Sequence, residues 1–232
     1  MRILLTDTTW AMAILAKKLR DAGFFVTEAG DVAELLEFAR NGQQDAVVID
    51  PDLPSGTLPD LLRQLRAAHA QMPLCIHTRD MDKADRLRAM TCGADDIFDN
   101  AMTMEEIEAR LRAYVRRASG FGSPVVKVGD LSVDLDRQSV HLNDMPIHLT
   151  RLEYELIETM CLRNGKLITR EEIMLQLYAW QDEPDAKIID VYICRIRAKL
   201  AAAGATDDVI MTSFAQGYRL NTRPAEVLPA AA

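Results

Sequence analysis

Five short apolar runs alternate with five amphipathic helical patterns over the first 117 residues, and this alternation constrains the fold most strongly. Repeated strand–helix units build a parallel sheet that is covered by helices on both faces. We therefore expect an α/β domain in this part of the chain. The predicted strands are residues 2–5, 25–28, 46–49, 74–77 and 96–98, and the predicted helices are residues 10–22, 32–41, 58–70, 83–91 and 104–117.

Asp50 directly follows the apolar run 46–49, so the sequence places a carboxylate at the carboxyl end of a parallel sheet. Ligands of open α/β sheets bind at that edge. A carboxylate that accepts a phosphoryl group needs a divalent cation held by further acids, and a positive charge on the developing phosphate. Thr8 and Asn100 stand where the second acid and a lysine would be needed. The site therefore keeps the scaffold of a phosphorylation switch and lacks much of its chemistry.

The length of 232 residues allows two domains, and the net charge of −8 divides evenly between them. An acidic chain argues against broad, non-specific binding to nucleic acid but leaves room for a small basic face. No apolar run approaches the roughly 20 residues of a membrane span. The four cysteines show no metal-binding or disulfide spacing. We expect a cytoplasmic protein with no cofactor, no metal and no membrane partner.

The second half of the chain has a different pattern, which begins after a Gly/Ser/Pro-rich stretch. We expect a first domain over residues 1–118, a linker over 119–125, a second domain over 126–221 and a disordered tail over 222–232. Four short strands, two capping-box helix starts, a third helix and a hairpin describe an α+β winged helix-turn-helix. The strands are residues 126–128, 131–135, 139–142 and 147–149; the boxes start at Thr150 and Thr169; the third helix runs from Pro184 to Leu200; and the hairpin joins 209–214 to 218–220.

The third helix of the second domain combines an apolar stripe with a set of cations that lie largely off it. Such a helix suits the major groove of DNA, where arginine can take guanine bidentately and further cations hold phosphates. The alternative is a solvated basic helix face. The stripe comprises Ile189, Ile193, Ile196 and Leu200, and the cations are Lys187, Arg195, Arg197 and Lys199.

Residues 188–200 resemble the recognition helix of OmpR/PhoB-type response regulators, and residues 182–191 and 147–150 are most similar to the CtrA cell-cycle branch. The resemblance extends from Met1 to about Leu220. It implies a flavodoxin-like (βα)5 receiver domain followed by a winged helix-turn-helix, and a double-stranded DNA partner. It also implies DNA contacts by Lys187, Arg195, Arg197 and an aromatic at Tyr178. Phe214 and Ala215 depart from the family by replacing an Arg-Gly pair in the wing.

Within the receiver resemblance, Asp7 matches one acid of a metal pair, Asp50 the phosphoacceptor and Thr78 the switch hydroxyl. Asp7 and Asp50 together could still hold magnesium weakly. The neutral amide of Asn100 cannot neutralise a phosphoryl oxygen as an ammonium does. We therefore expect Asp50 to be inactive as a phosphoacceptor. Three further departures from the family are Arg79, Ile97 and Ala101.

The resemblance further implies a dimer through the fourth helix, the fifth strand and the fifth helix of the receiver. The family's ion pairs between subunits map onto Arg86 with Glu106 and onto Asp96 with Arg117. The neighbouring pair is broken, because Arg110 faces a position occupied by Cys92. The alternative is that these residues are merely solvated charges.

These features together predict a sequence-specific transcriptional regulator, not an enzyme, that acts as a constitutive homodimer without aspartyl phosphorylation. RNA polymerase is a further candidate partner, whereas the missing chemistry calls a cognate histidine kinase into question. Two alternatives stay open: a conventional two-component regulator activated at Asp50, and a protein-interaction module with secondary DNA binding. A redox role for Cys194 on the third helix is less favoured than a role as a small filler, because nothing nearby marks a reactive thiolate.

Overall fold

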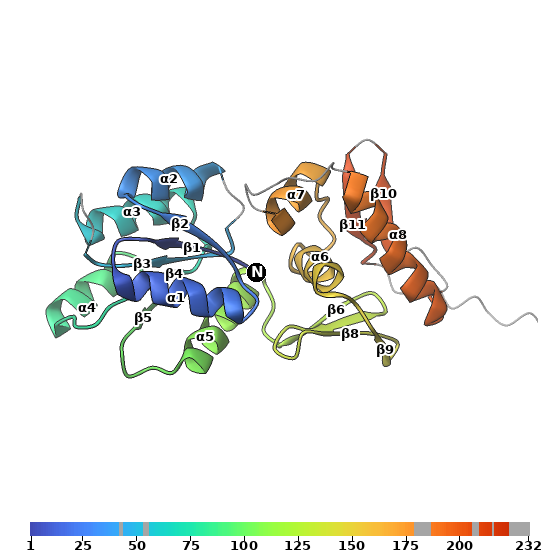
Figure 1. The fold of residues 1–232 in the computed structure, drawn as a ribbon, viewed down its shortest axis with the longest axis horizontal. Coiled ribbons are helices and arrows are strands. Elements are labelled where there is room, and N and C mark those ends of the chain that lie inside the picture. The colour runs from blue at the N-terminus through green and yellow to red at the C-terminus, as the bar shows by residue number, and fades with distance from the viewer. Residues whose placement is uncertain (42–43, 53–55, 179–186, 206–208, 215, 223–232) are drawn as a thin grey trace, which may run out of the picture. The chain divides into compact units, whose positions relative to one another are not determined.

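The structure is a computed structural model that describes residues 1–41, 44–52, 56–178, 187–205, 209–214 and 216–222 (Figure 1). The chain divides into two compact units, residues 1–120 and 121–232. The division falls inside the stretch 119–125 that the composition predicts as a linker. Ten of the eleven residues of the predicted tail, 223–232, lie outside the described residues.

The first unit is a five-stranded parallel sheet in the order β2-β1-β3-β4-β5. This order and the alternation of strands with helices confirm the expected flavodoxin-like α/β fold. The observed bounds differ from the predicted ones by two residues at most. They are β1 Arg2–Thr6, α1 Trp10–Asp21, β2 Phe25–Ala29, α2 Val32–Asn41, β3 Ala46–Ile49, α3 Leu58–Ala68, β4 Leu74–His77, α4 Lys83–Thr91, β5 Asp96–Phe98 and α5 Met104–Ala118.

The central strands of this sheet are buried along their whole length because helices cover both faces. Every residue of β1 and β3 is buried, which is the pattern of a parallel sheet enclosed on two sides. Figure 1 shows α1 and α5 on one face and α2 and α3 on the other. Leu61, Leu62 and Leu65 of α3 pack in the core on the α3 side. This packing fixes the carboxyl ends of the strands at one edge of the unit.

Helix starts in the first unit are set by short polar side chains that accept a backbone hydrogen bond from the first turn. Thr9, Thr57, Asp82 and Thr103 cap α1, α3, α4 and α5 in this way. Such caps typically contribute about 1 kcal/mol each. The cap of α1 matters for function, because it places Thr9 beside the end of β3.

The second unit opens with a four-stranded antiparallel sheet in the order β6-β7-β8-β9. Burial alternates along β7 and β8, as expected for a sheet with one covered face. The last strand begins two residues earlier than predicted. Asn143 and Asp144 both take positive φ and form a two-residue turn, so Leu142 pairs directly with Met145. The strands are β6 Val125–Val128, β7 Leu131–Asp134, β8 Ser139–Leu142 and β9 Met145–Ile147.

Three helices and a hairpin follow, which confirms the winged helix-turn-helix. Both capping boxes form: Glu153 accepts the Thr150 amide at 2.8 Å, and Glu172 accepts the Thr169 amide at 2.7 Å. The predicted helix start at Pro184 lies outside the described residues, and the helix ends two residues later than predicted. The elements are α6 Arg151–Leu162, α7 Arg170–Tyr178, α8 Lys187–Ala202, β10 Ile210–Ser213 and β11 Gly217–Leu220.

Candidate functional site

Asp50 lies at the carboxyl end of β3, beside β1, where the strand order of the sheet reverses. This reversal is the position at which doubly wound sheets bind ligands. The Asp50 side chain is only 5% exposed. Its backbone amide donates to the hydroxyl of Thr6 at the end of β1, at 2.8 Å. The two neighbouring strands therefore fix the carboxylate at the sheet edge that the sequence predicts.

Both carboxylate oxygens of Asp50 already accept hydrogen bonds within the chain. The Thr9 hydroxyl donates to Oδ2 at 2.6 Å, and the Asp52 amide donates to Oδ1 at 2.9 Å. Thr9 is also the N-cap of α1, and its oxygen accepts the Met12 amide at 3.4 Å. One threonine thus joins the start of α1 to the acid. The sequence analysis did not single out Thr9, although its position before an amphipathic helix marks it as a cap.

The other residues predicted for this site differ in their burial. Thr78 is buried, and its hydroxyl donates to the Asp80 carbonyl at 3.1 Å. Asp7 and Asn100 are exposed. The Thr8 hydroxyl is buried and has no hydrogen-bond partner within the described ranges. Thr8 therefore brings no charge to the position of the expected second acid.

A cavity of about 410 Å³ lies over Asp50 and is also lined by Thr78, Trp10 and Arg79. A second cavity of about 410 Å³ is lined by Asn100 and shares Arg79 with the first. The structure thus brings Thr78 together with Asp50 and places Asn100 in the neighbouring cavity. Sequence analysis noted Arg79 only as a departure from the family and did not identify the lining role of Trp10.

His77 lines both cavities. Burial lowers the pKa of its imidazole from the ordinary value, with Asp50 opposing this effect and Arg79 adding to it. Arg79 is the neighbouring cation and is exposed to solvent. The cation that lines the Asp50 cavity is therefore a solvent-exposed guanidinium and not an ammonium.

Asp7 and Asp50 are the two acids that were expected to hold a divalent cation weakly. Among the described residues, no three His, Cys, Asp or Glu side chains gather where they could share a metal ion. One oxygen of Asp50 is engaged by the Thr9 hydroxyl. The structure therefore adds no third such side chain to Asp7 and Asp50 among the described residues, and the weak magnesium site stays a prediction.

The third helix of the second unit has the predicted division into a buried stripe and a polar face. Ile189, Ile193 and Ile196 are buried, and Arg195 is exposed at mid-helix. Arg195 makes no ion pair with any residue in the described ranges. Lys187 is exposed in the first turn of α8. Both side chains stay candidates for DNA contact.

Arg197 is engaged inside the second unit instead of being presented to solvent. Its Nε and Nη2 donate to the Ile210 carbonyl at 3.2 and 2.6 Å, and Nη2 also donates to the Thr212 hydroxyl at 2.8 Å. The guanidinium lies 6.0 Å from the centre of the Tyr218 ring. Arg197 therefore joins α8 to the hairpin in this structure, and its phosphate contact stays a prediction.

Lys199 is likewise held by an internal partner. Its ammonium donates to the Glu153 carboxylate at 2.6 Å, and Glu153 is 2% exposed. Glu153 is also the capping-box acid of α6. Burial acts against the charged form, but the bonds from Lys199 and Thr150 outweigh it and lower the pKa of Glu153. Lys199 therefore has an internal partner in this structure, and its DNA contact stays a prediction.

Tyr178, at the end of α7, forms a hydrogen bond with Tyr192 of α8, with the two hydroxyl oxygens 2.8 Å apart. Burial and this neighbour raise the pKa of Tyr178 to about 12. The pair joins the two helices of the helix-turn-helix. Cys194 is exposed on α8, whereas the other three cysteines are buried.

The residues predicted for a dimer face carry ion pairs within one chain. Arg110 donates to Asp96 at 2.8 Å and to Glu106 at 2.7 Å. Arg86 donates to Asp99 at 3.4 Å. The two acids that were expected to pair with a second copy therefore already have a partner in α5. Arg117 is exposed.

Helix α4, which belongs to the predicted dimer face, carries two exposed apolar side chains that the sequence analysis missed. Leu87 is 70% exposed and Met90 is 45% exposed. Their i, i+3 spacing puts them on one side of the helix. Ala89 is the only buried residue of α4. The spacing of Leu87 and Met90 within a short and largely polar helix could have predicted this exposed apolar pair.

Comparison with known proteins assigns both units to families. Residues 3–112 match the response regulator receiver domain, and residues 144–220 match the C-terminal domain of transcriptional regulatory proteins. The cell cycle transcriptional regulator CtrA of Caulobacter vibrioides is 35% identical over 223 residues, covering 95% of this chain and 96% of that protein. The cell cycle response regulator CtrA of Brucella anthropi is 34% identical over 230 residues, covering 98% of each.

Among solved structures, the response regulator DrrB of Thermotoga maritima, an OmpR/PhoB homologue, is similar at 23% identity, with a TM-score of 0.44 and coverage of 95% of this chain and 98% of that one. No helix in the described part of the chain is long and apolar enough to cross a membrane.

Proposed function

The chain belongs to the OmpR/PhoB family of response regulators and is a DNA-binding transcriptional regulator, and we propose that it acts as a constitutive homodimer without phosphorylation of Asp50. Within this proposal the receiver unit assembles the dimer and the winged helix reads DNA. The protein works in the cytoplasm, where its DNA is, and RNA polymerase is a candidate partner. It is not proposed to be an enzyme, and it needs no cognate kinase.

The observation that carries the proposal is the engagement of both Asp50 oxygens. Attack of a carboxylate on a phosphodonor requires an oxygen lone pair that can reach the phosphorus and a cation that stabilises the charge on the phosphoryl group. Thr9 holds one oxygen at 2.6 Å, the Asp52 amide holds the other at 2.9 Å, and the amide of Asn100 brings no charge. These contacts favour an acid that fixes α1 to β3 over an acid that reacts.

Phosphorylation is tested by incubating the full chain with acetyl phosphate and magnesium and measuring the added phosphoryl mass. We expect no stoichiometric labelling of wild type. The triple variant Thr8→Asp/Thr9→Ala/Asn100→Lys removes the hydrogen bond on one Asp50 oxygen, supplies an acid and an ammonium at the two other positions, and should gain labelling. Labelling of wild type that disappears in Asp50→Ala would instead establish the conventional phosphorylated regulator.

The homodimer is supported by the apolar pair on α4 and the charged surface on β5 and α5. Leu87 and Met90 expose apolar area on α4, and Arg110 organises an ion-pair network between β5 and α5. Burial of apolar surface in a second copy contributes roughly 25 cal/mol per Å², whereas the exposed ion pairs contribute only about 0–1 kcal/mol each. The apolar pair therefore supplies the main affinity and the charges supply orientation.

Sedimentation of the unphosphorylated full chain tests the dimer. Wild type should sediment as a dimer at tens of micromolar, and Leu87→Asp should sediment as a monomer. Ile14→Asp places the same charge on an exposed apolar position of α1 and serves as the matched control, which should stay dimeric. A monomeric wild type would overturn the constitutive dimer and favour a form that assembles only after activation.

A second candidate function is a protein-interaction module with secondary DNA binding. The exposed apolar side chains of Trp10 and Ile14 on α1 favour it, because they lie i, i+4 on one helix face. Sequence discrimination separates the two functions. A protein that binds specific and scrambled duplexes equally well would support the interaction module.

A further inference from the structure

Phe214 is the most exposed large hydrophobic residue in the described part of the chain, at 95%. It directly follows β10, in the turn of the hairpin, where the amide of Gln216 donates to the Ser213 carbonyl at 3.0 Å. The turn therefore holds an aromatic ring away from the unit's own core. A ring that the fold leaves in water at such a vertex is available to another surface.

The hairpin that carries Phe214 is fixed to the start of α7. Ile168 and Tyr218 exchange backbone hydrogen bonds of 2.8 and 2.9 Å. Gly217, at φ +145°, allows this approach, because an added Cβ would lie 2.0 Å from the Ile168 carbonyl oxygen. The base of the turn therefore has a defined position relative to the helix-turn-helix.

The hairpin is also fixed along α8. Near the start of α8, Asp190 accepts a hydrogen bond from the Tyr218 hydroxyl, and two turns later Arg197 donates to Ile210. Tyr218 is close to the turn of the hairpin and Ile210 is at its base. The turn thus points toward the first half of α8, and Figure 1 shows the hairpin running beside that helix.

We propose that Phe214 is a wedge that enters the minor groove next to the major-groove site read by α8 and partly unstacks one base step. The inference rests on the proposed DNA-binding function and deepens it. Apolar side chains inserted between base steps kink a duplex toward the major groove, and a fixed hairpin loses little conformational freedom on insertion. Pyrimidine–purine steps unstack most easily, so Phe214 selects for a TA or CA step beside the recognised bases.

The exposed side chain of Arg219 on β11 complements the wedge with a phosphate contact. The two residues leave different signatures. Removing an apolar wedge lowers affinity without changing the number of counterions released, whereas removing a phosphate contact reduces the salt dependence by about one charge. Phe214→Ala should therefore weaken specific binding about tenfold at unchanged salt slope, and Arg219→Ala should lower the slope.

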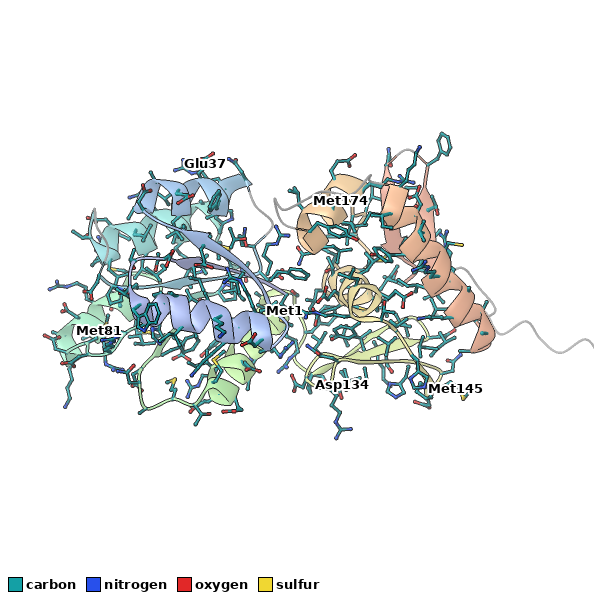
Figure 2. The ribbon with its side chains drawn as sticks, in the orientation of Figure 1. Met1, Glu37, Met81, Asp134, Met145 and Met174 are labelled. Atoms are coloured by element: carbon teal, nitrogen blue, oxygen red, sulfur yellow. The ribbon has the colours of Figure 1, made fainter. Side chains whose placement is uncertain are left out.

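The test uses the full chain and a duplex that wild type selects from a random library, with 2-aminopurine replacing adenine at each flanking TA step. Binding of wild type should raise the fluorescence at one step, because the base is unstacked there, and should bend the duplex. Phe214→Leu should retain much of both signals and Phe214→Ala should lose them. Met145→Ala removes an exposed apolar side chain from β9 of the same unit (Figure 2) and should behave as wild type.

Three outcomes decide the matter. Loss of fluorescence change and bending in Phe214→Ala, with retained selectivity for the bases read by α8, establishes the wedge. Equal affinity, fluorescence and bending of wild type and Phe214→Ala overturns the wedge and leaves the DNA-binding function intact, with Phe214 then facing a protein. Failure of wild type to prefer any duplex overturns the wedge together with the proposed function.

Discussion

Arg195 and Arg197 are two residues apart on α8. Replacing Arg195 by a neutral residue should weaken DNA recognition, whereas replacing Arg197 should lower the stability of the hairpin. Arg197 makes three hydrogen bonds to β10, of 2.6, 2.8 and 3.2 Å. Hydrogen bonds from a charged group contribute about 1.5–3 kcal/mol when well formed. The guanidinium of Arg197 is half-buried, and Arg197→Met keeps the apolar stem. We therefore expect the hairpin to be destabilised by about 2 kcal/mol.

Hydrogen exchange of the β10 and β11 amides in the full chain measures this loss locally. A destabilisation of about 2 kcal/mol corresponds to roughly thirtyfold faster exchange. Arg195→Ala is the matched control, because Arg195 is exposed and makes no ion pair in the described ranges. It should leave exchange unchanged and cost about 1–3 kcal/mol of binding to the preferred duplex while flattening discrimination against scrambled DNA.

The opposite pattern would refute this assignment. If Arg197→Met leaves amide exchange at wild-type rates and lowers the salt slope of DNA binding by about one, then Arg197 is a phosphate contact. If Arg195→Ala leaves the ratio of specific to scrambled affinity unchanged, then α8 does not read bases through this residue.

Lys187→Ala should weaken binding to all duplexes similarly and lower the salt slope by about one, measured by titration across salt concentrations. Lys199→Met leaves the Glu153 carboxylate buried without its ammonium, so denaturant unfolding should show a loss of about 2 kcal/mol that Glu153→Gln in the same background partly restores. The hydrogen bond from Tyr218 lowers the pKa of Asp190 in the folded protein. Ionised Asp190 therefore stabilises the fold above the unfolded-state pKa of about 3.9, and this stabilisation is lost as the pH falls through the pKa of Asp190 in the folded state. The melting temperature of wild type should therefore fall more steeply below about pH 4 than that of Asp190→Asn, as followed by circular dichroism.

Local patterns in the sequence were sufficient to predict the element order and the boundaries within two residues in most elements. The buried run 46–49 with Asp50 at its end required a parallel strand whose carboxyl end carries an acid. Thr150 and Thr169 each had a glutamate three residues later, so their helix starts followed from capping chemistry alone. These features depend on residues that are close in the chain, so they can be predicted from the local sequence.

The roles of individual polar side chains were decided by the tertiary structure. Arg195, Arg197 and Lys199 look equivalent in sequence, yet in the described part of the chain Arg197 is held by hydrogen bonds and Lys199 by an ion pair, whereas Arg195 is exposed and has neither. Arg197 and Lys199 meet their partners on β10 and α6, which lie 13 and 46 residues away. In the same way, Thr9 reaches Asp50 across 41 residues. Helical periodicity fixes the direction in which a side chain leaves its own helix, but the acceptor that satisfies it is supplied by packing between distant segments.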